Sequence, residues 1–159
     1  MQIKIDELDK KILALLAKNG RMSNAEIARM VGAGERTVNN RVNNLIDSGV
    51  VHIIGVINAK AFGYKVMADV LCEVEAARIE AVAHEIALLP ETRYVAISFG
   101  EHNVSAQVES KSTQDLYRFV AQKLSKISGI QKVTTVIIPE IIKDIEDWVP
   151  VELLAEGNN

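Results

Sequence analysis

The sequence predicts an α+β protein with an N-terminal helix-turn-helix domain of the winged type and a C-terminal domain of ferredoxin-like βαββαβ order. Two observations lead to this fold class. Over the first 50 residues apolar side chains recur at helical spacing between glycines, whereas from residue 66 onward alternating strands enclose two amphipathic helices. With 159 residues, 48% of them hydrophobic, the chain suffices for one ordinary domain or two small ones.

The first predicted helix starts at Asp6 and ends at Asn19-Gly20. Its apolar positions at helical spacing are Leu8, Ile12, Leu15 and Leu16. This helix would cover the inner faces of the two helices that follow. Three helices of this size form a small core that is only marginally stable by itself.

The next two helices form the predicted helix-turn-helix. Ser23 can cap the first of them, and Glu26 stands where a capping box requires it. Gly32-Ala33-Gly34 ends this helix, and the second begins near Glu35. The apolar residues that would face inward from the second helix are Val38, Val42 and Leu45.

The outer face of the second helix is the predicted DNA-contacting surface, because its side chains have the reach and donors to meet base edges in a major groove. Two short amphipathic helices also occur in many domains that bind no nucleic acid. The asparagines on this face favour DNA binding over a face that is merely solvated. A solvated face would more often carry Glu and Lys, which are strong helix formers, whereas asparagine is a poor one. The predicted set is Ser23, Arg36, Thr37, Asn39, Asn40, Arg41 and Asn44, with Arg41 placed opposite the buried residues.

The charge distribution is weakly consistent with this assignment. The net charge of -3 argues against a uniformly basic nucleic-acid binder. Residues 1–50 nevertheless hold eight Lys or Arg against six Asp or Glu, so the acidic excess lies in the remainder. A mildly positive N-terminal part on an acidic body fits a chain whose beginning meets phosphate.

The segment after the helices is β-branched and apolar over 50–58, which predicts a strand that forms an arm between two domains. Lys60 and Gly63 interrupt this pattern, so a flexible connection is expected from Asn58 to Tyr64. The predicted division is a helix-turn-helix domain (1–50), a strand arm and linker (51–64), a ferredoxin-like domain (65–145) and a tail (146–159).

The second half follows the order βαββαβ. Strands are expected over 66–75, 92–99, from 104 to 108 and over 130–138, and helices over 78–89 and from 112 to 124. Right-handed crossovers put both helices on one face of the antiparallel sheet. Val70 and Val74 point to one face while Met67 and Leu71 point to the other, so the uncovered face is expected to pack on a second copy.

Few residues in this sequence are candidates for a disulfide, a metal site or catalysis. Cys72 is the only cysteine, and His52, His84 and His102 show no metal-ligand spacing, so no disulfide, metal, cofactor or catalytic residue is predicted. The N-terminus lacks the apolar run of a signal peptide, and no stretch is long enough to cross a membrane. A cytoplasmic protein is therefore expected.

Three motifs carry a resemblance to a known family. They are 8–13 (LDKKIL), 20–28 (GRMSNAEIA) and 41–45 (RVNNL), followed by the βαββαβ pattern. Together they resemble the Lrp/AsnC transcription regulators, also called feast/famine regulatory proteins, over nearly the whole chain. The resemblance implies a sequence-specific regulator of amino-acid or related metabolism whose C-terminal RAM-type domain senses an effector and drives assembly to dimers and often octamers.

The resemblance also assigns residues. The recognition helix falls on Arg36, Thr37, Asn40, Arg41 and Asn44, with Arg41 the best match. Relatives often carry basic residues where this chain has Asn43 and Asn44, so DNA affinity is expected to be lower or less salt-dependent.

The family's ligand loop matches Gly100-Glu101-His102-Asn103, where Asn103 replaces an acid and removes a charge that could pair with a ligand ammonium. The same four residues also suit a plain hairpin turn.

Two alternative functions remain. Sirohaem decarboxylases resemble the same architecture, but they would need arginines near the arm, and 51–56 contains none. The other alternative is an effector-binding module whose helix-turn-helix does not bind DNA.

Overall fold

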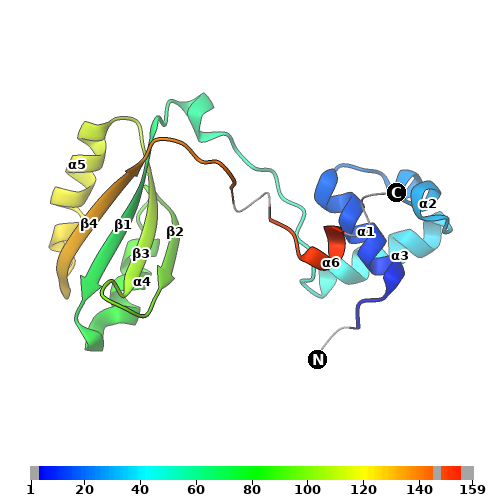
Figure 1. Ribbon diagram of the computed structural model, residues 1–159, viewed down its shortest axis with the longest axis horizontal. Helices are drawn as coiled ribbons and strands as arrows, with labels where there is room; N and C mark the ends of the chain where they lie inside the picture. The colour runs from blue at the N-terminus through cyan, green and yellow to red at the C-terminus, as the bar shows by residue number, and fades with distance from the viewer. Residues whose placement is uncertain (1–3, 145–147, 155–159) are drawn as a thin grey trace. The chain divides into compact units, whose positions relative to one another are not determined.

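The computed structural model describes residues 4–144 and 148–154, and the chain divides into two compact units (Figure 1). The helical unit comprises Met1–Val56 and Lys143–Asn159, and the sheet unit comprises Ile57–Ile142. The chain thus leaves the helical unit once and returns to it. The predicted tail (146–159) falls in the helical unit, and its residues 146–147 and 155–159 lie outside the described part.

Three helices build the helical unit as predicted: α1 (Glu7–Lys18), α2 (Asn24–Val31) and α3 (Glu35–Asp47). Ile12, Ile27 and Val38, one from each helix, are fully buried and meet in a single core. A short fourth helix, α6 (Val151–Leu154), adds Leu153 to the edge of this core. The C-terminal segment therefore enlarges an apolar core that three short helices would leave small.

The helix caps differ from the prediction in one respect. Ser23 caps α2, since its Oγ accepts a hydrogen bond from the amide of Glu26 at 3.2 Å, but a reciprocal bond from the Glu26 side chain is absent within the described residues. The capping box is found instead at α1. There the Asp9 amide donates to Asp6, and the Asp6 amide donates to Asp9.

The strand expected over 50–58 is not formed, because residues 51–58 have no secondary structure. A β-branched, apolar segment becomes a strand only when another strand satisfies its backbone groups. Within the described part of this single chain, no strand pairs with it. Ile54 and Ile57 consequently remain exposed.

The sheet unit has the predicted βαββαβ order. Its elements are β1 (Val66–Val74), α4 (Ile79–Ala87), β2 (Thr92–Ile97), β3 (Val104–Ser110), α5 (Thr113–Gln122) and β4 (Ile130–Ile138). The strand order is β2-β3-β1-β4, and each neighbouring pair is antiparallel. Short 3₁₀ segments lie at Ala59–Phe62, Ala76–Arg78 and Leu124–Lys126.

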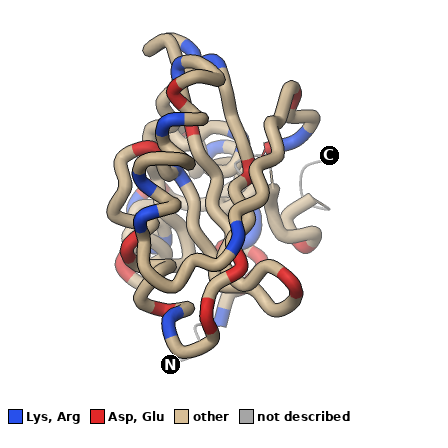
Figure 2. Tube along the Cα trace, turned by 90° about the vertical axis from the view of Figure 1, so that its left-hand side faces the viewer, with Lys and Arg blue, Asp and Glu red and all other residues tan. Residues whose placement is uncertain are grey.

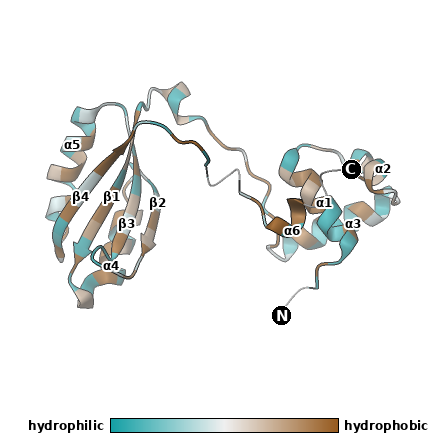
Figure 3. Cartoon of the chain, viewed as in Figure 1, coloured by the Kyte–Doolittle hydropathy of each residue, from teal (hydrophilic) through white to brown (hydrophobic). Residues whose placement is uncertain are grey.

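The two faces of the sheet have different surroundings. The inner face, which includes Val70 and Val108, packs against Ile86 of α4 and Phe119 of α5, so both helices cover the same side. Hydropathy along the strands alternates accordingly (Figure 3). On the opposite, outer face, Met67 of β1 pairs with Ile138 of β4, whereas Val136 pairs with Asp69 and Leu71 with Thr134, so apolar residues alternate with polar ones across these two strands.

Asn103 fastens the β2–β3 loop to the end of β1. Its side-chain amide donates to the Val74 carbonyl at 2.7 Å, and its Oδ1 accepts from the Val74 amide at 2.8 Å. The side chain therefore imitates a paired peptide group just where the β1–β3 register ends at Cys72 and Val104. Both ends of the amide are needed, because Val74 presents one donor and one acceptor.

We expect Asn103→Asp to lower the free energy of unfolding of the sheet unit by roughly 1 to 3 kcal/mol. A carboxylate still accepts from the Val74 amide, but it cannot donate to the Val74 carbonyl. Urea unfolding followed by circular dichroism measures the change. Asn43→Asp, which alters the charge equally at an exposed position of α3, is the control and should leave the sheet unit unaffected. Identical urea midpoints for both variants and the wild type would disprove this role of Asn103.

Candidate nucleic-acid interface and effector loop

The turn between α2 and α3 follows from the residues that bound it. Gly32 ends α2 with a positive φ of 68°, a conformation that glycine adopts without strain, and α3 starts two residues after Ala33. Asn24 of α2 donates to the Oδ1 of Asn39 on α3 at 2.8 Å. The two helices are thus joined by a polar contact as well as by the buried core.

Four of the predicted DNA-contacting residues share the exposed side of α3: Arg36, Thr37, Asn40 and Asn44. Within the described residues their side chains have no hydrogen bond or ion pair, so their donors and acceptors face solvent. Ser23 and Asn39 are also exposed, but Ser23 caps α2 and Asn39 bonds to Asn24. Contact with DNA by these six residues remains a prediction.

Arg41 does not lie opposite the buried residues, so this part of the prediction is wrong. It stands three residues after Val38 and four before Leu45, at the edge of the α3 face that packs inward. Its Nη1 lies 2.7 Å from Oδ2 of Asp6 and 3.1 Å from Oδ2 of Asp9, at the start of α1. Helical spacing alone could not reveal a partner more than 30 residues away in sequence.

This cluster shifts the pKa values of Asp6 and Arg41. The hydrogen bond to Asp6, followed by the charges of Asp9 and Asp6, raises the pKa of Arg41 above its usual value. The Asp9 amide, followed by the Arg41 guanidinium, lowers the pKa of Asp6 below 3.8. The folded state therefore gains stability from Asp6 above pH 3.8, and this gain is lost as the pH falls through the lower, folded pKa.

The predicted effector loop is held mainly by two of its own residues. The carbonyl of His102 accepts a hydrogen bond from the Ser98 hydroxyl at 2.8 Å, and Asn103 is occupied by Val74. Glu101 lies 3.5 Å from Lys132, and both side chains are more than half exposed. Gly100 has a φ of 138°. Glu101 and the loop backbone are thus the parts available to a ligand, whereas Asn103 serves the fold.

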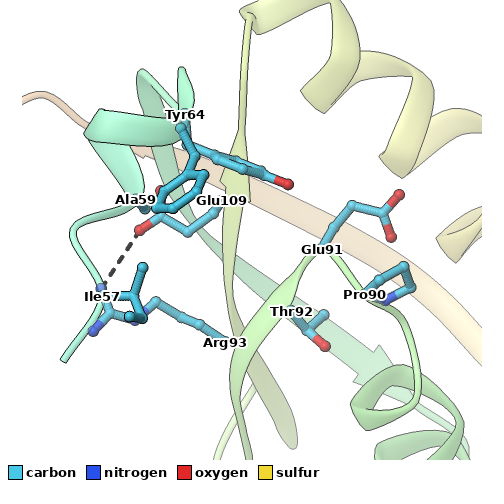
Figure 4. A pocket seen from close by; sticks show the side chains of 9 residues that line it. Ile57, Ala59, Tyr64, Pro90, Glu91, Thr92, Arg93 and Glu109 are labelled. Atoms are coloured by element: carbon cyan, nitrogen blue, oxygen red, sulfur yellow. Dashed lines mark hydrogen bonds and ion pairs between the residues drawn. The ribbon is translucent and has the colours of Figure 1, made fainter. Parts of the chain in front are cut away.

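A second concave site, which the sequence did not predict, lies elsewhere in the sheet unit. It has a volume of about 330 Å³, and the apolar part of its wall includes Ile57, Phe62 and Tyr64 (Figure 4). Arg93 and Glu109 form an ion pair of 3.5 Å in the same wall. An apolar wall with a few charged groups suits a small amphipathic molecule.

Other chemistry finds little support in the described part of the chain. No group of three or more His, Cys, Asp or Glu residues there could hold a metal ion. Burial raises the pKa of the Cys72 thiol to about 11, so this cysteine is protonated and unreactive at neutral pH. No helix among the described residues is long and apolar enough to cross a membrane. Lys and Arg residues are interspersed with Asp and Glu residues along the chain, as the colours of the Cα trace in Figure 2 show.

Comparison with known proteins identifies both halves of the chain. Residues 5–52 match the winged helix-turn-helix DNA-binding family, and residues 57–151 match the PF0864 C-terminal dimeric alpha+beta barrel domain. The HTH-type transcriptional regulator PH0140 of Pyrococcus horikoshii is 37% identical over 89% of this chain and 90% of its own length. LrpA of Pyrococcus abyssi is 31% identical over 87% of this chain and 99% of its own length.

A solved structure has the same fold. The transcriptional regulator NMB0573 of Neisseria meningitidis, in complex with L-Met, superposes with a TM-score of 0.83 at 22% identity, over 89% of this chain and 94% of that chain. The family models and the relatives agree with the helix-turn-helix and the four-stranded sheet described above. The chain belongs to the Lrp/AsnC family of HTH-type transcriptional regulators.

Proposed function

We propose that this regulator recognises an operator sequence through the exposed face of α3 and responds to a small effector, an amino acid, bound by the sheet unit. The observation that carries the proposal is the set of polar side chains on α3 without partners in the described structure: Arg36, Thr37, Asn40 and Asn44. The protein would work where the DNA is, in the cytoplasm of a prokaryotic cell. No enzymatic activity is proposed, since the relatives described above are named as regulators.

The placement of these residues on α3 suits base recognition. In helix-turn-helix proteins the N-terminal part of the second helix contacts base edges, and Arg36, Thr37 and Asn40 belong to the first two turns of α3. An arginine can bond a guanine bidentately, and an asparagine can bond an adenine. The face therefore combines one cation with neutral side chains that read bases.

We expect Arg36→Ala to weaken DNA binding and, if Arg36 contacts a phosphate, to reduce the slope of log affinity against log salt by about 1. Asn40→Ala should lose roughly 1 to 3 kcal/mol at one base position. Fluorescence anisotropy on duplex from upstream of the protein's own gene measures both. Arg118→Ala, on the exposed side of α5, is the control and should bind like the wild type. Wild-type affinity in Arg36→Ala and Asn40→Ala together would reject this face.

Dimerisation through the outer face of the sheet is part of the proposal. The apolar residues of this face are Met67, Leu71, Val136 and Ile138. Asp69 lies among them as the register partner of Val136, which is about half exposed at 48%. The matching family model describes a dimeric alpha+beta barrel domain. Two sheets packed on these faces would bury the apolar residues and present two copies of α3 to one operator, with further assembly toward an octamer.

We expect Val136→Asp to weaken the dimer by roughly tenfold or more, because a second carboxylate would stand directly opposite Asp69 in the middle of this face. Analytical ultracentrifugation of the full chain over a dilution series measures the dissociation constant. Leu88→Asp introduces the same charge at a more exposed residue after α4 and serves as the control. A dimer of unchanged stability in Val136→Asp would place the interface on another surface.

The effector site is proposed at the Gly100 to Asn103 loop. Glu101 offers a carboxylate to a ligand ammonium, and the amides of Gly100 and Glu101 have no partner within the described residues and could hold a carboxylate. A zwitterionic amino acid needs both groups. The complex of NMB0573 with L-Met supports this ligand class. The pocket beside Arg93 and Glu109 is the rival location, since its wall also offers charges of both signs, from Arg93 and from Glu91 and Glu109.

We expect Glu101→Gln to weaken amino-acid binding by roughly tenfold or more, through loss of a charged hydrogen bond. Glu109→Gln is the matched variant, because it removes the same charge from the rival pocket. Isothermal titration calorimetry with L-methionine compares them with the wild type. Weakening in Glu109→Gln alone would move the site to the pocket, and no wild-type heat with L-methionine or other amino acids would reject an amino-acid effector.

A further inference from the structure

We propose that Arg41 positions the recognition helix by tying α3 to the start of α1, and that it does not itself contact DNA. This inference rests on the proposed DNA-binding function and assigns a different role to the arginine that best matches the family's recognition helix. It arises from an ion-pair cluster inside the helical unit, formed by Arg41, Asp6 and Asp9.

A single guanidinium nitrogen serves both carboxylates. Nη1 of Arg41 donates to Oδ2 of Asp6 at 2.7 Å and to both oxygens of Asp9 at 3.1 Å. The two aspartates also cap α1 reciprocally, through hydrogen bonds of 2.9 and 3.1 Å to each other's amides. Arg41 thus joins α3 to the part of α1 whose geometry the capping box fixes most firmly.

Burial makes this contact obligatory for Asp9. The Asp9 side chain is only 7% exposed, whereas the side chains of Asp6 and Arg41 are 44% and 38% exposed. If Arg41 left, the Asp9 carboxylate would keep the Asp6 amide as a partner but would lose the one cation that pairs with it among the described residues. A buried charge without its counterion is strongly unfavourable, so Arg41 has little freedom to turn toward a ligand.

The charge of the cluster also argues against phosphate binding. Two carboxylates and one guanidinium leave a net charge of -1, and the exposed Asp6 carboxylate lies beside the arginine. A DNA phosphate approaching Arg41 would meet this negative charge. Arg36, in contrast, stands on the exposed side of α3 and has no acidic partner within the described residues.

The position of Arg41 on α3 explains how it could affect DNA binding indirectly. Successive residues of a helix are turned by about 100°, so a side chain held at the edge of the buried face fixes the rotation of α3 about its axis. That rotation sets where Asn40 and Asn44 point. Recognition requires side chains held within roughly 0.5 Å of their productive positions, which a small core alone holds less firmly.

The test compares two arginines of the same helix. Arg41→Gln and Arg36→Gln make the same chemical change, and Asp9→Asn removes the charge on which Arg41 acts while keeping the shape of the side chain. Arg41→Lys and the double variant Asp9→Asn/Arg41→Gln complete the set. The wild type and all variants are titrated with mixed-sequence duplex and with the upstream duplex at several salt concentrations, at a temperature where circular dichroism shows each to be folded.

We expect Arg41→Gln and Asp9→Asn to weaken binding to the upstream duplex by the same factor, roughly tenfold, and the double variant to be no weaker than either. The salt slope should remain that of the wild type in all three, while Arg36→Gln should weaken binding and, if Arg36 contacts a phosphate, reduce the slope by about 1. Arg41→Lys should recover part of the affinity. The amide resonances of Asn40 and Asn44 should shift in Asp9→Asn, which a change of stability alone would not produce.

Other results overturn the inference. A salt slope lowered by about 1 in Arg41→Gln, with wild-type affinity in Asp9→Asn, would make Arg41 a direct phosphate contact. Additive losses in the double variant, or unchanged affinity in every variant, would remove the link through Asp9. Should Arg41→Gln not fold, Asp9→Asn and Arg41→Lys decide the matter alone. A wild type that binds neither duplex would reject the proposed function, whereas the Asn40 and Asn44 resonances would still show whether Asp9 orients α3.

Discussion

The small size of the helical core is the constraint on which the DNA-binding half depends. Three short helices bury few large side chains, and a core of that size confers little stability. The chain adds three further ties: the capping box of Asp6 and Asp9, the ion pair from Arg41 to both, and the packing of Leu153 from the far end of the chain. The ion pair and Leu153 join α1 to other parts of the unit, while the capping box fixes the start of α1 itself, so α1 is the base against which the unit is held.

The sheet unit is stabilised by a different kind of contact, between a side chain and the backbone. Its core is larger, because two helices pack against one face of a four-stranded sheet. The β2–β3 loop lies just beyond the last paired residues of β1 and β3. Asn103 holds this loop by replacing a missing pair of backbone hydrogen bonds with its own amide. The side chain of Asn103 therefore serves the fold, and Glu101 remains the loop's charged group toward solvent.

The spacing of apolar residues predicted most of the fold. A repeat of two residues indicates a strand and a repeat of about 3.6 indicates a helix, and both can be recognised within a short stretch of sequence. This spacing led to wrong predictions where a side chain's partner is distant in sequence, or where a segment has no neighbouring strand. Arg41 lies between the buried and exposed sides of α3, and only Asp9 on another helix decides which side it serves. The segment 50–58 has a strand's composition but no strand beside it. The three-residue spacing that predicts a capping box at Ser23 and Glu26 also occurs at Asp6 and Asp9, where the structure forms one.

The composition of the recognition face links DNA binding to assembly. With Arg41 engaged by α1, Arg36 is the one cation among the predicted α3 residues that face solvent in the described structure. Few phosphate contacts mean little counterion release, so one copy of α3 would bind DNA weakly. Joining two copies makes the second contact intramolecular and raises the overall affinity without any new side chain. On the proposed function, an effector that binds one assembly more tightly than another would therefore control DNA occupancy by changing how copies meet, and α3 itself need not move.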